Sequence, residues 1–96
     1  MTYMARIEQH RSAIVVLVSK HRAANPRLFG SVLLNRDGPD SDIDILVDAL
    51  PGATLFDLGA LQVELEDLLG ATVDLLTPGD ISSAFRERVL EQAQPI

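Results

Sequence analysis

The chain has 96 residues, no cysteine, 8 basic against 14 acidic residues, and a formal net charge of -6. This length predicts one domain over residues 1–96, and the lack of cysteine excludes a disulfide framework or a thiolate zinc site and fits a reducing cytoplasm. The acidic balance without a basic block disfavours direct binding of nucleic acid, and no apolar run is long enough to cross a membrane.

The first predicted element is a helix over about residues 3–23, where Ile7, Ile14 and Val18 recur at helical spacing. The Asn25-Pro26 pair is expected to act as a breaker, because proline disfavours helical geometry at the residue before it. A short strand over residues 27–29 follows. His10 and His21 are interpreted as surface or partner-facing residues rather than as a metal pair.

In residues 30–54 the sequence predicts a turn, a strand and a second turn. Gly30-Ser31 opens a turn, with a brief helix expected through Asn35 and a loop at "RDGPDS". The stretch "DIDILVD", residues 42–48, is rich in β-branched residues and predicts a strand. "LPGAT" is then a second turn.

The C-terminal half predicts a helix, a strand and a final helix. Leucines form one stripe over residues 55–69, and Gly70 is a natural C-terminal cap. "TVDLLT" is a third strand, and Asp80 is expected to cap the last helix. Arg86 and Arg88 on that helix are expected to form surface ion pairs. The order predicts an α/β (α+β) fold, a small mixed sheet of about three strands flanked by helices.

Acidic residues interrupt two of the predicted strands. Asp42 and Asp44 point to the same side of a strand because side chains alternate, and Asp74 lies between apolar residues of the next strand. Carboxylates held together repel one another, and a bound divalent cation such as Mg²⁺ removes that cost. Asp48 has the same parity but lies at the far end of the strand, where a solvated terminus is the better interpretation.

The Gly30-Ser31 turn adds a candidate phosphate site. Glycine lets the backbone approach a ligand, and serine can cap a helix whose free N–H groups bind phosphate. An isolated Asp-x-Asp is usually a solvated strand edge, and an isolated Gly-Ser is usually only a turn. Their combination, with a third acid in the next strand, favours a site for a nucleoside triphosphate with its magnesium.

These residues give the chain its resemblance to a known family. A hydrophobic residue, Gly-Ser, a gap of ten residues, Asp-hydrophobic-Asp and a later single Asp resemble the polymerase-β-type nucleotidyltransferase superfamily. The length and "PDSDIDILVD" are most similar to its minimal nucleotidyltransferases, the MNT group. The resemblance covers nearly the whole chain.

The resemblance implies roles for single residues. Gly30 and Ser31 would bind the triphosphate, Asp42 and Asp44 would hold two Mg²⁺ ions, and Asp74 would ligate the metal next to the attacking hydroxyl and help deprotonate it. The implied reaction transfers AMP from ATP to a hydroxyl, with tyrosine the expected acceptor.

The resemblance also implies a partner. The implied role is that of a cytoplasmic antitoxin that modifies, and so neutralises, an all-helical HEPN toxin in a hetero-oligomer.

The chain departs from the family pattern directly after Gly-Ser. Family members often continue with a small residue, Arg and Gly, whereas Leu34 and Asn35 stand at the Arg and Gly positions here. Arg36, two residues beyond the usual Arg, is the candidate to replace it in binding the nucleotide. Two alternatives stay open: an antitoxin that acts by binding alone, and a nucleotidyltransferase with another acceptor.

Overall fold

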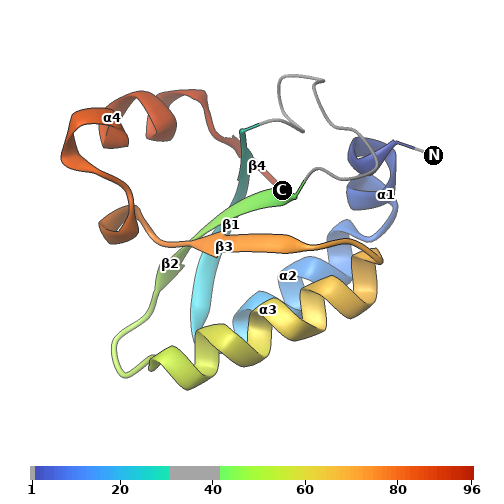
Figure 1. Ribbon diagram of the computed structural model, residues 1–96. Helices are drawn as coiled ribbons and strands as arrows, with labels where there is room; N and C mark the ends of the chain where they lie inside the picture. Colours follow the sequence, from blue (N-terminus) through green and yellow to red (C-terminus); the bar gives the residue numbers. More distant parts are fainter. Residues whose placement is uncertain (1, 31–41) are drawn as a thin grey trace.

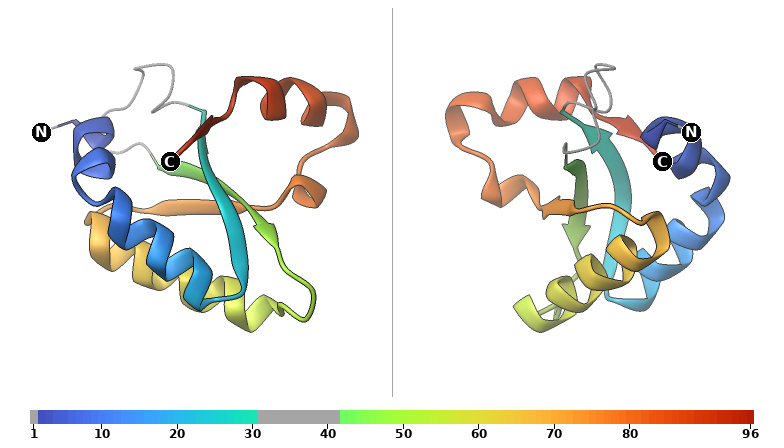
Figure 2. Two further views of the ribbon diagram at one scale, coloured as in Figure 1. Left: turned by 180° about the vertical axis from the view of Figure 1, so that it is seen from behind. Right: turned by 45° about the vertical axis from the view of Figure 1, so that its right-hand side comes forward.

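The computed structural model describes residues 2–30 and 42–96. Within them one mixed sheet has the strand order β3-β2-β1-β4, and β2 pairs antiparallel with β1 and parallel with β3. The strands are β1 (Ala23–Phe29), β2 (Ile43–Ala49), β3 (Val73–Leu76) and β4 (Gln94–Pro95). Helices α1 (Tyr3–Gln9), α2 (Arg11–Lys20) and α3 (Leu55–Leu69) lie on one side of the sheet, and α4 (Ser83–Gln92) lies on the other (Figures 1 and 2).

Strand β2 is the centre of the molecule. Its residues Ile43, Ile45 and Val47 are fully buried and belong to the core under the helices, together with Ile14 of α2 and Leu61 of α3. Alternation of side chains along a strand then directs the residues between them to the opposite face. The hydrophobic pattern of β2 therefore decides which of its residues can form a site.

The predicted mixed fold is confirmed, with one strand more than expected among the described residues. Strand β4 has two residues, one of them Pro95, and it pairs with the end of β1. Such a segment carries no sequence signal of a strand, because proline has no N–H for a ladder.

Helix α3 begins and ends where the sequence predicts. Thr54 and Asp57 form a reciprocal capping box at its start. Gly70 ends it in the left-handed conformation with φ 64°.

The predicted first helix is two helices. Helix α1 ends at Gln9 with His10 as its C-cap, α2 begins at Arg11, and Ala23 belongs to β1. No proline or glycine marks the break. The tertiary contact that accompanies it is Arg6, which donates to the carbonyl of Leu69 at 2.8 Å and so ties α1 to the C-terminus of α3.

The expected breaker at Asn25-Pro26 lies inside a strand. β1 continues through it by a register shift between Ala24 and Arg27, with Asn25 at φ 53°. Proline is tolerated at such a bulge because no ladder N–H is required there. The sequence prediction of a strand over residues 27–29 was therefore too short.

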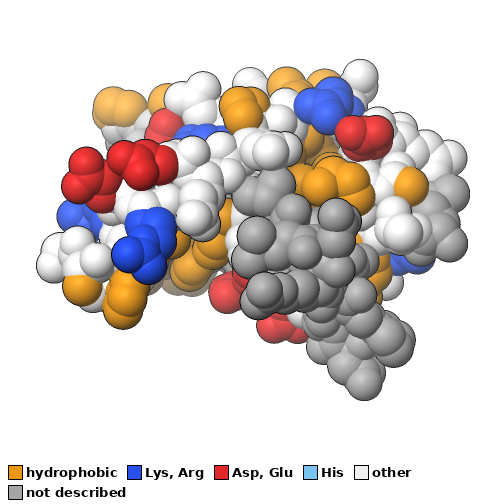
Figure 3. Space-filling view, turned by 90° about the horizontal axis from the view of Figure 1, so that it is seen from above, with side chains coloured by type: hydrophobic (Ala, Val, Ile, Leu, Met, Phe, Trp, Pro, Cys, Tyr) orange, Lys and Arg blue, Asp and Glu red, His pale blue; other side chains and the backbone are white. Residues whose placement is uncertain are grey.

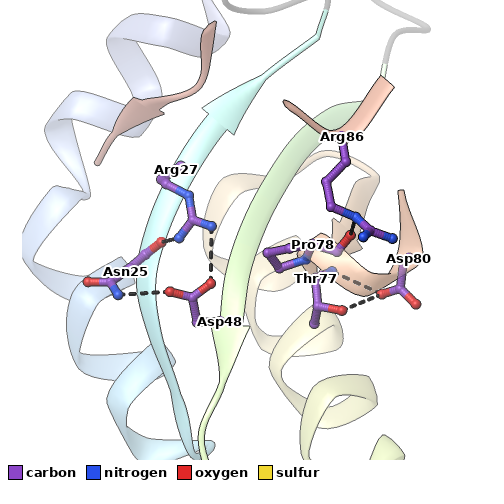
Figure 4. A network of polar contacts seen from close by, with 7 residues as sticks. All are labelled: Asn25, Arg27, Asp48, Thr77, Pro78, Asp80 and Arg86. Atoms are coloured by element: carbon purple, nitrogen blue, oxygen red, sulfur yellow. Dashed lines mark hydrogen bonds and ion pairs between the residues drawn. The ribbon is translucent and has the colours of Figure 1, made fainter. Parts of the chain in front are cut away.

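Asp80 does not cap α4. It closes a 3₁₀ turn, η1 (Pro78–Asp80), by accepting from the Thr77 N–H and hydroxyl, both at 2.9 Å, and Ser82 caps α4. Arg86 makes no surface ion pair within the described residues. Its guanidinium instead donates to the carbonyls of Pro78 at 2.7 Å and Ile81 at 3.0 Å, which fixes η1 to α4 (Figure 4).

The predicted features at positions 31–41, the brief helix through Asn35 and the loop after it, lie outside the described residues. None of the helices described has the length and apolar character that a membrane span requires.

Helices α2 and α3 are joined by a charged contact at Glu64. The His21 ring bonds to the Glu64 carboxylate, and the Lys20 ammonium lies 3.2 Å from it. His21 is therefore a half-buried contact within the chain rather than the surface or partner-facing residue expected from the sequence. The His21 hydrogen bond, and then that of Lys20, hold the pKa of Glu64 below its usual range.

We predict that Glu64 contributes to the loss of stability in acid. A carboxyl whose pKa is lowered by folding stabilises the native state above its unfolded-state pKa, and this contribution disappears as the pH falls through the folded-state pKa. In urea unfolding from pH 7 to pH 2, Glu64→Gln should therefore lose less stability in acid than the parent. Glu87→Gln on α4 is the matched control and should follow the parent, and parallel curves for the parent and Glu64→Gln would contradict the assignment.

Candidate functional site

The turn at Gly30 lies directly against the carboxylate of Asp44. Phe29, the last residue of β1, pairs with Asp44 of β2, and Gly30 follows with φ +76°. A Cβ built on Gly30 would lie 2.9 Å from the Asp44 Cγ and closer still to Oδ2. Both the positive φ and the absence of a side chain are therefore required at this position.

Asp74 lies on the other side of Asp44. The parallel register of β2 and β3 pairs Asp44 with Asp74, and the flanking pair Ile43 and Val73 is buried in the core. Both carboxylates consequently point to the face of the sheet away from α2 and α3. Adjacent strands are about 5 Å apart, so two carboxylates share one small area of this face.

Asp42 is placed differently. It is exposed and precedes β2, one residue before the first paired position, Ile43. Within residues 2–30 and 42–96, no three His, Cys, Asp or Glu side chains are gathered closely enough to hold a metal ion. The structure thus brings Gly30, Asp44 and Asp74 together and does not add Asp42 to them. Ser31 and Arg36 lie outside the described residues.

Asp48 is engaged elsewhere on β2. Its carboxylate accepts from Asn25 at 2.8 Å and from Arg27 at 3.1 Å, across the bulge in β1 (Figure 4). The Asn25 hydrogen bond, and then that of Arg27, lower the pKa of Asp48. Its charge is therefore satisfied by the fold, which supports leaving it out of the ligand set.

Two further features of this face were not found from the sequence. Phe29 is half-buried and pairs with Asp44, so its side chain lies on the same face of the sheet beside that carboxylate. In the sequence, only its position before Gly30 pointed to Phe29. Its place beside Asp44 becomes clear only from the strand register.

The second is a hollow of about 470 Å³ along α4, lined by residues Ser83, Arg86, Glu87, Leu90 and Glu91. Over α4, acidic, basic and hydrophobic side chains lie side by side (Figure 3).

The donor set fits a divalent cation by its chemistry. Asp44 and Asp74 supply carboxylate oxygens, the ligands that Mg²⁺ prefers, and Asp42 is two residues from Asp44 along the chain. Gly30 has no side chain, so its backbone lies directly beside the Asp44 carboxylate. A polyphosphate with its metal needs this combination of hard oxygen ligands and close backbone approach.

The fold is a mixed sheet flanked by helices, and its register gathers Gly30, Asp44 and Asp74 at one place. The family model described as "Nucleotidyltransferase domain" matches residues 10–96. The chain therefore belongs to the nucleotidyltransferase domain family, and the resemblance inferred from its Gly-Ser and Asp-x-Asp elements is confirmed.

A relative from Methanocaldococcus jannaschii, "putative protein adenylyltransferase MJ0435", is 38% identical over 87 residues, which are 91% of this chain and 94% of that protein.

Solved structures agree with this assignment. A structure described as a "putative minimal nucleotidyltransferase" superposes with a TM-score of 0.88 at 36% identity and covers 100% of this chain and 97% of its own. A second, described as a toxin–antitoxin with AMP-PNP, gives a TM-score of 0.72 at 26% identity over 88% of this chain and 69% of the other.

We predict that Gly30→Ala damages both the fold and the site. The added Cβ meets the Asp44 carboxylate, and the left-handed φ costs a non-glycine residue about 1–2 kcal/mol. Urea unfolding should show a loss of at least this size, and Mg²⁺ titration should show weaker binding. Gly79→Ala, whose Cβ would meet only the Thr77 hydroxyl at 3.9 Å, is the control and should cost less. Equal stability of the two variants would contradict the close packing of Gly30 on Asp44.

Proposed function

We propose that this chain is a single minimal nucleotidyltransferase domain that transfers AMP from ATP to a protein hydroxyl, with tyrosine as the acceptor. The observation that carries the proposal is the strand register that pairs Asp44 with Asp74 and sets Gly30 against Asp44. Membership of the nucleotidyltransferase family supports the reaction class, and the name of the relative supports a protein as acceptor.

The proposed role of each candidate residue follows from its position. Asp44, central between Gly30 and Asp74, would ligate Mg²⁺ together with Asp42, which directly precedes the same strand. Asp74, exposed on the edge strand β3, would lie on the side from which an acceptor can approach. Gly30 and Ser31 would receive the triphosphate, with Arg36 as a further phosphate contact.

The proposed transfer forms one bond at the α-phosphorus of ATP and breaks another. The acceptor oxygen forms a bond to the α-phosphorus of ATP, the bond from that phosphorus to the pyrophosphate oxygen breaks, and Asp74 takes the hydroxyl proton. Two Mg²⁺ ions, when bound, would neutralise the triphosphate and acidify the acceptor hydroxyl. The chain itself would hold the reacting groups in line, and this positioning supplies most of the rate enhancement in a phosphoryl transfer.

A HEPN toxin is the proposed partner, in a cytoplasmic hetero-oligomer. The structural neighbour described as a toxin–antitoxin with AMP-PNP supports both a toxin partner and an adenine nucleotide. The described residues place two carboxylates on the face of the sheet away from α2 and α3 and show no second domain around them. A partner protein would supply the acceptor and the missing walls.

Label transfer from ATP tests the proposal. With Mg²⁺ and the co-purified toxin, ATP labelled at the α-phosphate should label the toxin, and ATP labelled at the γ-phosphate should not. Asp44→Asn should lower the rate by about a hundredfold or more, because it removes a charged ligand at the reacting phosphate.

Asp48→Asn is the matched control, since Asp48 lies on the same strand and face but is bound to Asn25 and Arg27. It should retain the parent rate. No transfer of α-label to the toxin by the parent protein, or equal rates for Asp44→Asn and the parent, would overturn the proposal.

Neutralisation by binding alone is the second candidate function. Two observations favour it: Leu34 and Asn35 replace the usual Arg and Gly, and the described residues hold no preassembled group of three metal ligands. In that case Asp44→Ala should still protect cells that express the toxin. Loss of protection, with the variant folded and still bound to the toxin, would instead support the enzyme. An acceptor other than this toxin would appear as α-label on another molecule.

A further inference from the structure

The outer side of α3 is an apolar stripe that nothing in the described part of the chain covers. Phe56 is 90% exposed and Val63 is 56% exposed, although the opposite side of the same helix supplies buried leucines to the core. Gly59 and Ala60 lie between them, and a Cβ built on Gly59 would have nothing within 4 Å. At 100° per residue these four positions and Asp67 fall within an arc of roughly 100°.

The side chains of the stripe are arranged symmetrically by size about its centre. Large residues stand at positions 56 and 63, and small residues stand at 59 and 60. If two α3 helices cross antiparallel on a two-fold axis between Gly59 and Ala60, Phe56 of one copy meets Val63 of the other. The small residues then meet at the centre, where they let the helix backbones approach. This reciprocal pairing is what an isologous dimer interface requires.

The charges at the ends of the stripe are also complementary. The other carboxylates of α3 are engaged: Asp57 in the capping box, Glu64 with α2, and Glu66 with the Val73 N–H at 2.9 Å. Asp67 alone among them has no hydrogen bond or ion pair within the described residues.

In the antiparallel pairing Asp67 lies about 11 Å from the axis, beyond the first residue of the second copy's α3 and next to the turn that precedes it. Arg22 lies at that turn, with its guanidinium 3.3 Å from the Gly52 carbonyl and no carboxylate partner in the described part of the chain.

We propose that this stripe is a dimer interface between two copies of the chain, with Phe56 packed on Val63, Gly59 on Ala60, and Asp67 paired with Arg22 across a two-fold axis. The interface goes beyond the proposed catalytic function and does not depend on it. Helix α3 lies on the opposite side of the sheet from Asp44 and Asp74, so both candidate sites of a dimer remain open (Figure 1).

Sedimentation equilibrium of the full chain, from about 1 µM to about 1 mM, tests the interface. The parent protein should show a monomer–dimer equilibrium, and Phe56→Ala should raise the dissociation constant by about tenfold or more, because an aromatic anchor is lost in each copy. Phe85→Ala is the matched control: Phe85 is also an exposed helical phenylalanine, at 59%, but on α4. It should leave the equilibrium unchanged.

A charge exchange tests the orientation. Asp67→Arg and Arg22→Asp should each weaken the dimer, and the double variant should restore it. Aspartate tolerates the left-handed backbone at position 22, where φ is 58°. A parent protein that stays monomeric to 1 mM, an equal effect of Phe56→Ala and Phe85→Ala, or a double variant no better than the single ones would overturn the proposal.

Discussion

The position of the candidate site depends on the burial of one side of β2. Ile43, Ile45 and Val47 fill the core, and a slip of one residue would bury Asp44 and expose these three. Because a carboxylate in an apolar core and the loss of a core strand are both costly, this register is strongly determined. The parallel pairing with β3 and the antiparallel pairing with β1 then bring Asp74 and Gly30 to the same carboxylate.

The carboxylates on this face of the sheet differ in their surroundings. Asp48 is bound by Asn25 and Arg27, which lower its pKa and hold it in the fold. Asp74 is exposed on an edge strand, and Asp44 lies between it and Gly30. One strand therefore contributes a structural carboxylate at one end and a candidate ligand at the other, and the difference comes from neighbouring strands rather than from residue type.

Much of this could be predicted from the sequence, and the failures have physical causes. Helix α3 was predicted to the residue because its leucine stripe and Gly70 are local signals, whereas the capping box of Thr54 was not predicted. The bulge at Asn25-Pro26 and the two-residue strand β4 depend on tertiary pairing, which local propensity does not encode. Asp44, Asp74 and Gly30 were chosen from strand alternation and turn chemistry, whereas the close contact of Gly30 with Asp44 and the role of Phe29 required the register.

Asp44 and Asp74 are proposed to hold a divalent cation next to the turn at Gly30. A crystal structure with Mn²⁺ and a non-hydrolysable ATP analogue measures this directly, because Mn²⁺ is located by its anomalous scattering. A metal peak is expected between the Asp44 and Asp74 carboxylates, with the triphosphate against Gly30. Metal bound away from both carboxylates, or an Asp74 side chain turned away from the nucleotide, would contradict it.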